Sequence, residues 1–291
     1  MNTNKHVMLL GGDERYLHVI DSLAKAGIRI SLIGYEQLSF NEPNIQHVGL
    51  DNADFSSLRA IILPVAGTDL KGKIEVTYSD KQVYLTEQLV SCTPKQCVIY
   101  SGTANQYLQQ IADVTDRKLV KLFARDDIAI YNSIPTAEGT LKLAIEQSDE
   151  TIHGANVCVL GFGRVGITVA RVFSAVGANV SVAARSSAAV ARITEMGFHA
   201  IPLNQLEKAI GQMTICINTI PSQVVDQSII SAMSPSVLLI DLASKPGGTD
   251  FDFALKRGIS TFHALGLPGK TAPKSAGKII ATVLLDLLQS T

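Results

Sequence analysis

The sequence predicts an α/β fold with two doubly wound, parallel-sheet domains, joined by a connecting helix and separated by an interdomain cleft. The first observation is length, because the chain has 291 residues and a domain takes roughly 150 residues. The second is pattern: short apolar runs alternate with amphipathic stretches along both halves, as expected where helices connect parallel strands. The third is composition, since 46% hydrophobic and 18% charged residues provide for two buried cores.

The first domain, residues 1–131, alternates strand and helix from its beginning. "HVMLL" is typical of a buried strand, and the amphipathic stretch that follows is typical of a helix ending at Gly27. Further short apolar runs continue the series toward the middle of the chain. The expected elements are a strand at 6–10, a helix at 14–26, and strands at 28–34, 60–67 and 97–102.

The second domain, residues 132–291, repeats this pattern after a connecting helix at 135–148, with Pro135 in its first turn, and a linker at 149–155. Its final helix, at about 272–291, is apolar enough to pack against a domain, and the first domain is one candidate. The expected elements between them are strands at 156–161, 179–184, 214–221 and 237–244, and helices at 165–176 and 187–196.

Bulk properties exclude several classes of function. The formal net charge is −1 and no run of five like charges occurs, which argues against binding to nucleic acid or to a membrane surface. The apolar runs are shorter than the ~20 residues of a membrane span, and the N-terminus is typical of a first strand rather than of a signal peptide. The four cysteines form no C-x-x-C pattern, so we expect a cytoplasmic protein without a metal site.

A glycine-rich turn in the second domain predicts a Rossmann-like dinucleotide site. The six residues Gly161, Phe162, Gly163, Arg164, Val165 and Gly166 form a complete G-x-G-x-x-G between a strand and a helix. The first domain offers only Gly11-Gly12, followed by Asp13 and Glu14. Two acids at a helix N-terminus oppose a phosphate, so we assign the cofactor to the second domain and Asp13 to helix capping.

The end of the next strand predicts which dinucleotide binds. Many NAD sites carry an acid there for the ribose 2′-hydroxyl, but this chain has Arg185, Ser186 and Ser187. A cation with hydroxyl neighbours favours the 2′-phosphate of NADP(H). The alternative is a solvated arginine, with Ser187 capping the following helix. Thr219 and Pro221, after a later strand, complete the expected cofactor site.

Four segments together carry a resemblance to a known family. They are "VMLLGGDERYLHVIDSLAKAG" (7–27), "GFGRVG…VSVAARSS", "DLASKPGGTDF" (241–251) and "ALGLPGKTAPKSAGKII" (264–280). The whole chain resembles the A subunits of bacterial dipicolinate synthase. More distantly, the segment before the glycine turn resembles the hinge helix of D-2-hydroxyacid dehydrogenases, and "DLASKPGG" is similar to a turn of alanine dehydrogenase.

The resemblance implies an activity and partners that composition does not. It implies NADP-dependent oxidation of a dihydrodipicolinate-type ring to dipicolinate, pyridine-2,6-dicarboxylate, in the mother cell of a sporulating bacterium. It also implies a partner, the flavoprotein-like B subunit of dipicolinate synthase, while homo-oligomerisation stays open. The alternatives are a D-2-hydroxyacid or alanine-type dehydrogenase, and a non-catalytic NADP-sensing subunit.

A small dicarboxylate substrate needs cationic or N–H-rich receptors in the cleft. Arg15 and Tyr16 open a helix at a carboxyl edge of the first sheet, where such folds bind ligands, although Arg15 reads equally as a surface residue. Ser101 and Thr103 offer hydroxyl groups, or else form an ordinary turn. Lys270 and Thr271, which precede the final helix, are further candidates for binding the substrate. Lys270 and His263 are the candidate catalytic groups, and the alternative for His263 is a packed, structural histidine.

Overall fold

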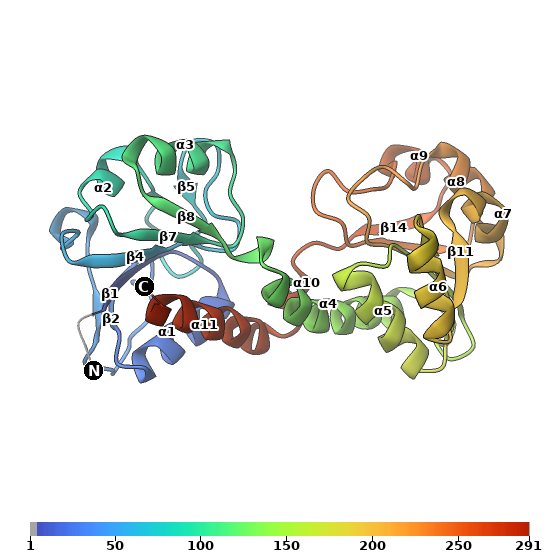
Figure 1. The fold of residues 1–291 in the computed structure, drawn as a ribbon, viewed down its shortest axis with the longest axis horizontal. Helices are drawn as coiled ribbons and strands as arrows, with labels where there is room; N and C mark the ends of the chain where they lie inside the picture. Colours follow the sequence, from blue (N-terminus) through green and yellow to red (C-terminus); the bar gives the residue numbers. More distant parts are fainter. Residues whose placement is uncertain (1–4, 291) are drawn as a thin grey trace. The chain divides into compact units, whose positions relative to one another are not determined.

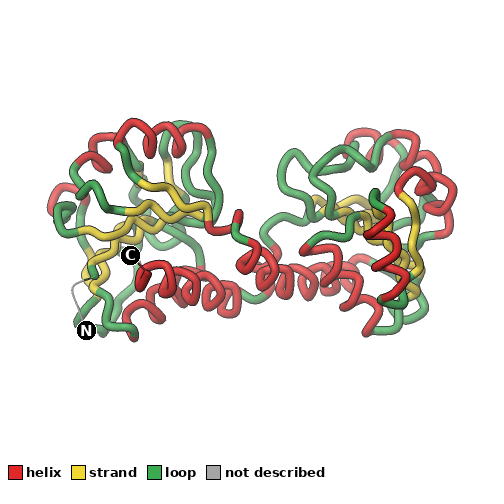
Figure 2. The backbone as a smooth tube through the Cα atoms, in the orientation of Figure 1, coloured by secondary structure: helices red, strands yellow, loops and turns green. Residues whose placement is uncertain are grey.

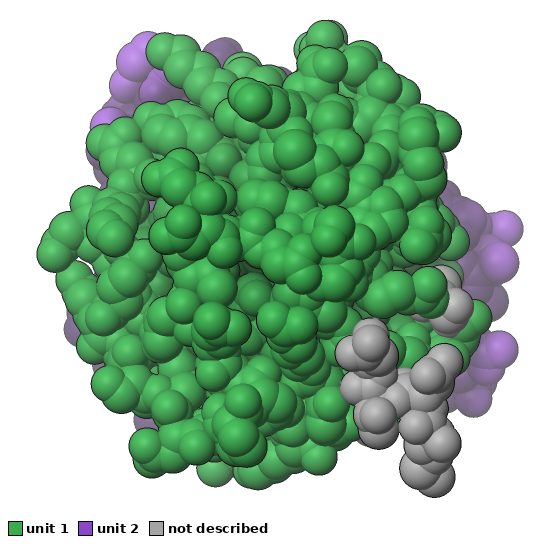
Figure 3. All heavy atoms as spheres, turned by 90° about the vertical axis from the view of Figure 1, so that its left-hand side faces the viewer, with its two compact units in different colours: residues 1–129, 273–291 green, residues 130–272 purple. Residues whose placement is uncertain are grey.

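The computed structural model of the chain describes residues 5–290. The chain divides into two compact units, which Figure 3 distinguishes by colour. Unit 1 comprises Met1–Ala129 and Pro273–Thr291, and unit 2 comprises Ile130–Ala272. The final helix therefore belongs with the N-terminal part of the chain, although the residues before it belong to unit 2.

Unit 1 contains a six-stranded parallel sheet in the order β3-β2-β1-β4-β7-β8. Helices α1 and α11 cover one face of this sheet, and α2 and α3 cover the other (Figure 1). The strands are β1 (His6–Leu10), β2 (Arg29–Ile33), β3 (Ile45–His47), β4 (Leu58–Ile62), β7 (Val98–Ser101) and β8 (Lys118–Lys121), with a small hairpin of β5 (Lys73–Ile74) and β6 (Val83–Tyr84). The helices are α1 (Glu14–Lys25), α2 (Glu87–Ser91), α3 (Gln106–Thr115) and α11 (Pro273–Ser290), with 3₁₀ turns at Leu50–Asn52 and Leu122–Ala124.

Unit 2 contains a second six-stranded parallel sheet, in the order β11-β10-β9-β12-β13-β14. Helices lie on both faces of the sheet, as the tube in Figure 2 shows. The strands are β9 (Asn156–Leu160), β10 (Asn179–Ala184), β11 (His199–Pro202), β12 (Ile215–Asn218), β13 (Leu238–Asp241) and β14 (Ser260–His263). The helices are α5 (Arg164–Ala175), α6 (Ser187–Glu195), α7 (Leu206–Ala209), α8 (Gln227–Ala232), α9 (Phe251–Lys256) and α10 (Leu267–Thr271), with 3₁₀ turns at Leu203–Gln205 and Ile210–Gln212. Helix α4 (Asp126–Gln147) begins in the last residues of the N-terminal part of unit 1 and continues into unit 2.

The prediction of two doubly wound parallel sheets is confirmed. In each sheet, successive strands first extend to one side of the opening strand and then continue on its other side. The strand order consequently reverses between β1 and β4 in unit 1 and between β9 and β12 in unit 2. Ligands of such folds bind outside the carboxyl ends of the strands at these switch points, so each unit offers one such edge.

The contact between α1 and α11 shows why the last helix joins unit 1. A Cβ atom at Gly277 of α11 would clash with the carbonyl group of Arg15 in α1, so the missing side chain allows the two helices to approach closely. Apolar residues of α11, including Ile280 and Leu284, lie in the same core as Val19 of α1. These contacts join the two ends of the chain into one core.

The connecting helix differs from its prediction. It begins at Asp126, so Pro135 lies inside α4 rather than in its first turn. Proline lacks the N–H group that a helix interior uses, and hydroxyl groups nearby bond to carbonyl groups of this segment. Ser133 Oγ donates to Ile130 O (2.6 Å) and Thr136 Oγ1 to Asn132 O (2.8 Å).

No helix within residues 5–290 is long and apolar enough to cross a membrane. The same residues contain no group of three or more His, Cys, Asp and Glu side chains arranged to hold a metal ion. Cys158 and Cys216 are free, buried neighbours on β9 and β12, and burial raises the pKa of the Cys158 thiol to about 12. These thiols therefore act as small core residues.

Candidate functional site

The glycine turn between β9 and α5 has two glycines that the protein's own packing requires. Gly161 has φ of +99°, and a Cβ atom there would lie 2.5 Å from Thr219 Oγ1. A Cβ atom at Gly166 would clash with the carbonyl oxygen of Gly161. These two positions therefore let the helix, the strand and the neighbouring turn come together.

Gly163 has a different role in the same turn. No atom lies within 4 Å of a Cβ atom built at this position, so the protein leaves this space open. Gly163 is the N-cap of the twelve-residue helix α5, without a side-chain capping bond and without an acid in the first turn. The helix N-terminus therefore presents backbone N–H groups and a positive dipole end to an anion.

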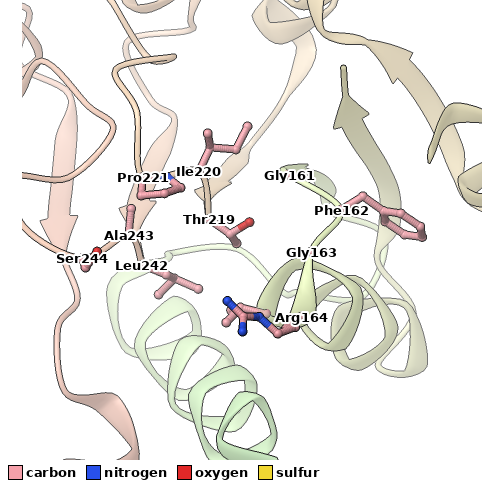
Figure 4. Close-up of a pocket in the computed structure, with 11 residues that line it drawn as sticks. Gly161, Phe162, Gly163, Arg164, Thr219, Ile220, Pro221, Leu242, Ala243 and Ser244 are labelled. Atoms are coloured by element: carbon pink, nitrogen blue, oxygen red, sulfur yellow. The ribbon is translucent and has the colours of Figure 1, made fainter. Parts of the chain in front are cut away.

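A pocket of about 440 Å³ lies beside this turn. Figure 4 shows that its residues come from the start of α5 and from the ends of β12 and β13. The lining residues are Gly161, Phe162, Gly163, Arg164, Val165, Thr219, Ile220, Pro221, Leu242, Ala243 and Ser244. The pocket thus brings together seven of the residues predicted to bind the cofactor, and it adds Ile220 and Leu242–Ser244, which the prediction missed.

A buried carboxylate organises the turn that carries Leu242–Ser244. Asp241 is fully buried at the end of β13. It accepts hydrogen bonds from Ala243 N (2.8 Å), Gly248 N (2.9 Å) and Thr249 Oγ1 (2.6 Å). Three charge-assisted bonds to one carboxylate fix the path of the turn, and with it one wall of the pocket. The motif "DLASKPGG" indicated in the sequence that this turn is a distinct feature, but the hydrogen bonds of Asp241 could be identified only in the structure.

His263 lies on the neighbouring strand β14, paired in register with Asp241. Its Nε2 atom lies 2.9 Å from Ala243 O, and its ring stacks against Phe251 with centroids 5.0 Å apart. These contacts match the packed, structural alternative that the sequence left open for this histidine. They tie His263 to the same pocket wall as Asp241.

Arg185 lines a separate pocket of about 590 Å³ in unit 2, together with Ser187, Val190, Ala191, Pro202, Leu203 and Asn204. None of these residues carries a carboxylate. The Arg185 side chain makes no hydrogen bond or ion pair with any residue between 5 and 290, and it is exposed. Ser186, rather than Ser187, caps α6, because its Oγ atom accepts a bond from Ala189 N at 3.2 Å. The alternative role suggested for Ser187 is therefore wrong.

Arg15 and Tyr16 begin α1 but differ in their environment. The Arg15 side chain is only 12% exposed and forms a bidentate ion pair with Asp13, the N-cap residue. Burial opposes the charge of the guanidinium, but the bonds with Asp13 raise the pKa of Arg15. Tyr16 is fully buried and donates to Leu63 O at 2.8 Å. Its side chain therefore supports the core, and the expectation that it contacts a substrate is corrected.

The other predicted substrate residues are distributed over both units. In unit 1, the buried Ser101 donates to Thr103 O (2.6 Å), and the exposed Thr103 donates to Val65 O (3.2 Å). In unit 2, Lys270 and Thr271 lie in the short helix α10, and Lys270 is exposed. A Cβ atom at Gly139 of α4 would lie 2.7 Å from Thr271 Oγ1, so this threonine packs against the long helix.

Comparison with known proteins gives matches to both halves of the chain. The family model for the N-terminal domain of the dipicolinate synthase A subunit matches residues 6–123. The model for the NAD binding domain of D-isomer specific 2-hydroxyacid dehydrogenases matches residues 124–245. The A subunit of dipicolinate synthase from Bacillus subtilis (strain 168) is 49% identical over 288 residues, which cover 99% of this chain and 97% of that protein.

Solved structures give the same relationship. The A subunit of dipicolinate synthase from Bacillus halodurans matches with a TM-score of 0.97 and 49% identity, covering 99% of both chains. The A chain of dipicolinate synthase from Bacillus subtilis matches with a TM-score of 0.95 and 49% identity, covering 100% of this chain and 97% of that one. A transhydrogenase from Sinorhizobium meliloti has a TM-score of 0.65 at 14% identity, covering 97% of this chain and 93% of that one, and shares the fold alone.

Proposed function

Because this chain belongs to the family of dipicolinate synthase A subunits, we propose that it catalyses the NADP-dependent oxidation of a dihydrodipicolinate-type ring to dipicolinate. Its second unit is a dehydrogenase-type, nicotinamide-binding domain, which makes the chain an oxidoreductase subunit. The choice of NADP(H), the ring substrate and the residue roles below are the proposal.

The space beside Gly163 at the N-terminus of α5 is the observation that carries the cofactor assignment. The backbone N–H groups of that turn would hold the pyrophosphate. Arg185 and Ser187 would hold the 2′-phosphate, since they line a pocket without carboxylates and Arg185 has no partner among residues 5–290. When bound, the nicotinamide supplies the hydride acceptor.

The oxidation removes two electrons from the ring. One C–H bond of the dihydropyridine breaks and its hydrogen leaves as hydride, while a proton is released, so that the ring becomes aromatic. The chain's task is to hold and orient the ring rather than to activate it strongly. We assign Asp241 and His263 to positioning, because both hold the Ala243 wall of the cofactor pocket.

The two carboxylates of the ring need hydrogen-bond donors. Unit 1 offers Arg15 and the exposed Thr103, and unit 2 offers the exposed Lys270. The family name identifies the chain as one subunit of a larger enzyme. We propose the flavoprotein-like B subunit of dipicolinate synthase as its partner, and the mother cell of a sporulating bacterium as the place of action.

A hydride-transfer assay tests this function. NADPH formation is followed by absorbance with a dihydrodipicolinate-type substrate, for the chain alone and together with the flavoprotein-like partner, with NAD⁺ in parallel. We expect NADPH formation that requires the substrate and disappears in Gly163→Val. NADP(H) binding without turnover under either condition would instead support the cofactor-sensing alternative.

A further inference from the structure

The turn that follows β13 ends in an exposed tip beside the cofactor pocket of unit 2. Its first residues, Leu242–Ser244, line that pocket, and Figure 4 shows them across the pocket from the glycine turn. The next two residues, Lys245 and Pro246, are exposed together with Ser244. The tip therefore presents a hydroxyl group and an ammonium group at one end of the proposed cofactor site.

The backbone below this tip is held in place from several sides. Asp241 accepts three hydrogen bonds from the turn, and Gly248 O accepts a further one from Val225 N at 2.9 Å. A Cβ atom at Gly248 would clash with the Asn218 side chain and with the carbonyl group of Ile220, so the returning half of the turn packs closely against the end of β12. The tip is consequently exposed but fixed, and a preorganised group binds a ligand at a lower cost in entropy.

The charges at this end of the pocket favour an anionic ligand. The residues that line the pocket include a cation, Arg164, and no acid. The side chains of Ser244 and Lys245 make no hydrogen bond or ion pair with any residue between 5 and 290. Asp241 lies in the same turn, but it is fully buried and its carboxylate already has three donors. The ammonium and the hydroxyl are both hydrogen-bond donors, and a carboxylate accepts from both.

The order of the strands places the reacting end of the cofactor beside this tip. In the proposed binding mode, Arg185 after β10 holds the 2′-phosphate, and the turn at Gly163 after β9 holds the pyrophosphate. Strands β12 and β13 follow on the other side of β9, so the nicotinamide half lies along the ends of these two strands. Hydride transfer requires the substrate ring to lie against the nicotinamide, and Ser244 lines this end of the pocket.

We propose that the Lys245 ammonium binds one carboxylate of the dicarboxylate ring at the nicotinamide end of the cofactor, and that the Ser244 hydroxyl donates a further hydrogen bond to it. Lys245 directly follows the lining residue Ser244, and its long, flexible side chain allows the ammonium to reach a ligand in the pocket. This inference rests on the proposed function, because that function supplies the ring dicarboxylate. Neither residue was identified from the sequence, since a lysine in a turn is ordinarily solvated.

Binding of dipicolinate, the product of the proposed reaction, tests the inference without any turnover. Its dissociation constant is measured by calorimetry at saturating NADPH, for the full chain alone and together with the flavoprotein-like partner. Lys245→Gln should weaken dipicolinate binding about tenfold or more, as expected for a lost bond between two charged groups. Ser244→Ala should weaken it less, and Lys245→Arg, which keeps the charge, should bind better than Lys245→Gln.

The matched control is Lys256→Gln in the same unit. Lys256 is an exposed residue at the end of α9 and does not line the pocket. This variant should bind dipicolinate within about twofold of the wild type, because an exposed charge away from the site contributes little. An equal loss of affinity in Lys256→Gln and Lys245→Gln would show only a general effect of charge, and it would overturn the inference.

Two further measurements on Lys245→Gln separate contact with the ring from other roles. Its affinity for NADPH should equal that of the wild type, and a clear loss would show that the lysine contacts the cofactor instead. Its melting temperature should also be unchanged, because Lys245 is exposed and has no partner among residues 5–290. A lower melting temperature would show that the lysine supports the fold, and either result would overturn the inference.

The inference and the proposed function can fail separately. Unchanged dipicolinate affinity in Lys245→Gln, or a wild type that does not bind dipicolinate under either condition, overturns the inference. If the wild type still forms NADPH from the ring substrate, the proposed function survives that failure. Conversely, dipicolinate binding that depends on Lys245, without NADPH formation even in the presence of the partner, supports the carboxylate site and rejects the oxidation.

Discussion

A Cβ atom at Gly161 would lie 2.5 Å from the Oγ1 atom of Thr219. Two turns that are distant in sequence can therefore lie in contact only because Gly161 has no side chain. Thr219 Oγ1 itself donates to Leu160 O at 2.8 Å, which holds the end of β12 against the end of β9. The glycine turn is thus part of the core of unit 2 on one side and faces open space on the other.

This difference predicts opposite behaviour for two glycine substitutions. Gly161→Ala should lower the free energy of unfolding by about 1–3 kcal/mol or more, because the residue has positive φ and no space for a methyl group. Gly163→Val should leave the unfolding free energy within about 0.5–1 kcal/mol of the wild type, yet abolish dinucleotide binding by filling the open space. Urea unfolding and cofactor titration measure the two effects. Normal cofactor binding by Gly163→Val would show that the dinucleotide does not bind beside Gly163.

Arg185 predicts cofactor preference. Arg185→Ala should weaken NADP(H) binding by about 1.5–3 kcal/mol, the value of a bond to a charged phosphate, and leave NAD(H) binding nearly unchanged. The matched control is Arg192→Ala on the following helix α6, since Arg192 pairs with Glu195 at 2.9 Å and does not line the Arg185 pocket. Fluorescence titration of both reduced cofactors gives the comparison. Equal wild-type affinity for NADPH and NADH would contradict the assignment.

The hydrogen bonds of Asp241 lead us to expect that replacing it lowers both the free energy of unfolding and the affinity for the cofactor. Asp241→Asn replaces one accepting oxygen by a donor, which cannot serve the Ala243 and Gly248 N–H groups and the Thr249 hydroxyl together. We expect a loss of about 1–3 kcal/mol in unfolding free energy, together with weaker cofactor binding. Asp252→Asn, an exposed acid on α9, serves as the control and should change neither. The prediction is wrong if the two variants behave alike.

His263 can be tested as a positioning residue against the proton-acceptor alternative. His263→Phe keeps a ring against Phe251 and removes the bond to Ala243 O. If the histidine only positions the wall, kcat/KM should fall about tenfold or less, and the shape of its pH profile should not change. Loss of a titrating limb near neutral pH in this variant would identify His263 as the proton acceptor.

His6 predicts how stability depends on pH. Its Nδ1 and Nε2 atoms lie 2.7 Å from Ser57 Oγ and 2.8 Å from Ser31 Oγ. Burial, with a contribution from the charge of Arg29, lowers the pKa of His6 below its ordinary value of 6.5. The unfolded chain therefore binds the proton more readily than the folded one, and stability falls as the pH drops below about 6.5 toward the folded pKa.

The measurement is urea unfolding between pH 5 and 8 for the wild type and for His6→Gln. The wild type should lose up to about 1.4 kcal/mol per pH unit more than the variant in the acidic range. His199→Gln, on an exposed residue of β11, should retain the wild-type dependence. Parallel pH curves for the wild type and His6→Gln would show that the buried histidine does not contribute.

Sequence patterns were sufficient wherever a short segment decides its own structure. The spacing of Gly161, Gly163 and Gly166 predicted the turn, because the strand–turn–helix motif brings Gly166 against the carbonyl group of Gly161 and leaves no space for a side chain. The alternation of apolar runs likewise predicted both parallel sheets. The family resemblance implied what no local pattern contains, namely the ring substrate and the partner protein that we propose.

The sequence does not distinguish the roles of adjacent residues when those roles depend on which of the two side chains is buried. Arg15 and Tyr16 are adjacent and both seemed available, but the helical period turns Tyr16 into the core and leaves Arg15 beside Asp13. The sequence suggested Ser187 as the cap of the following helix, but α6 begins at Ser187 itself, so Ser186 is the cap. Such choices depend on a single residue of register, which sequence patterns resolve poorly.

By itself, the sequence determined the two sheets and the glycine turn, because backbone sterics and hydrophobic periodicity act over a few residues. Only the tertiary structure decided that α11 packs with α1, that Asp241 and His263 hold one pocket wall, and that the Thr68 hydroxyl is buried without a hydrogen-bond partner among residues 5–290. These relationships join segments far apart in the chain. They depend on which side chains remain unpaired after the core has packed, and this is a property of the complete fold.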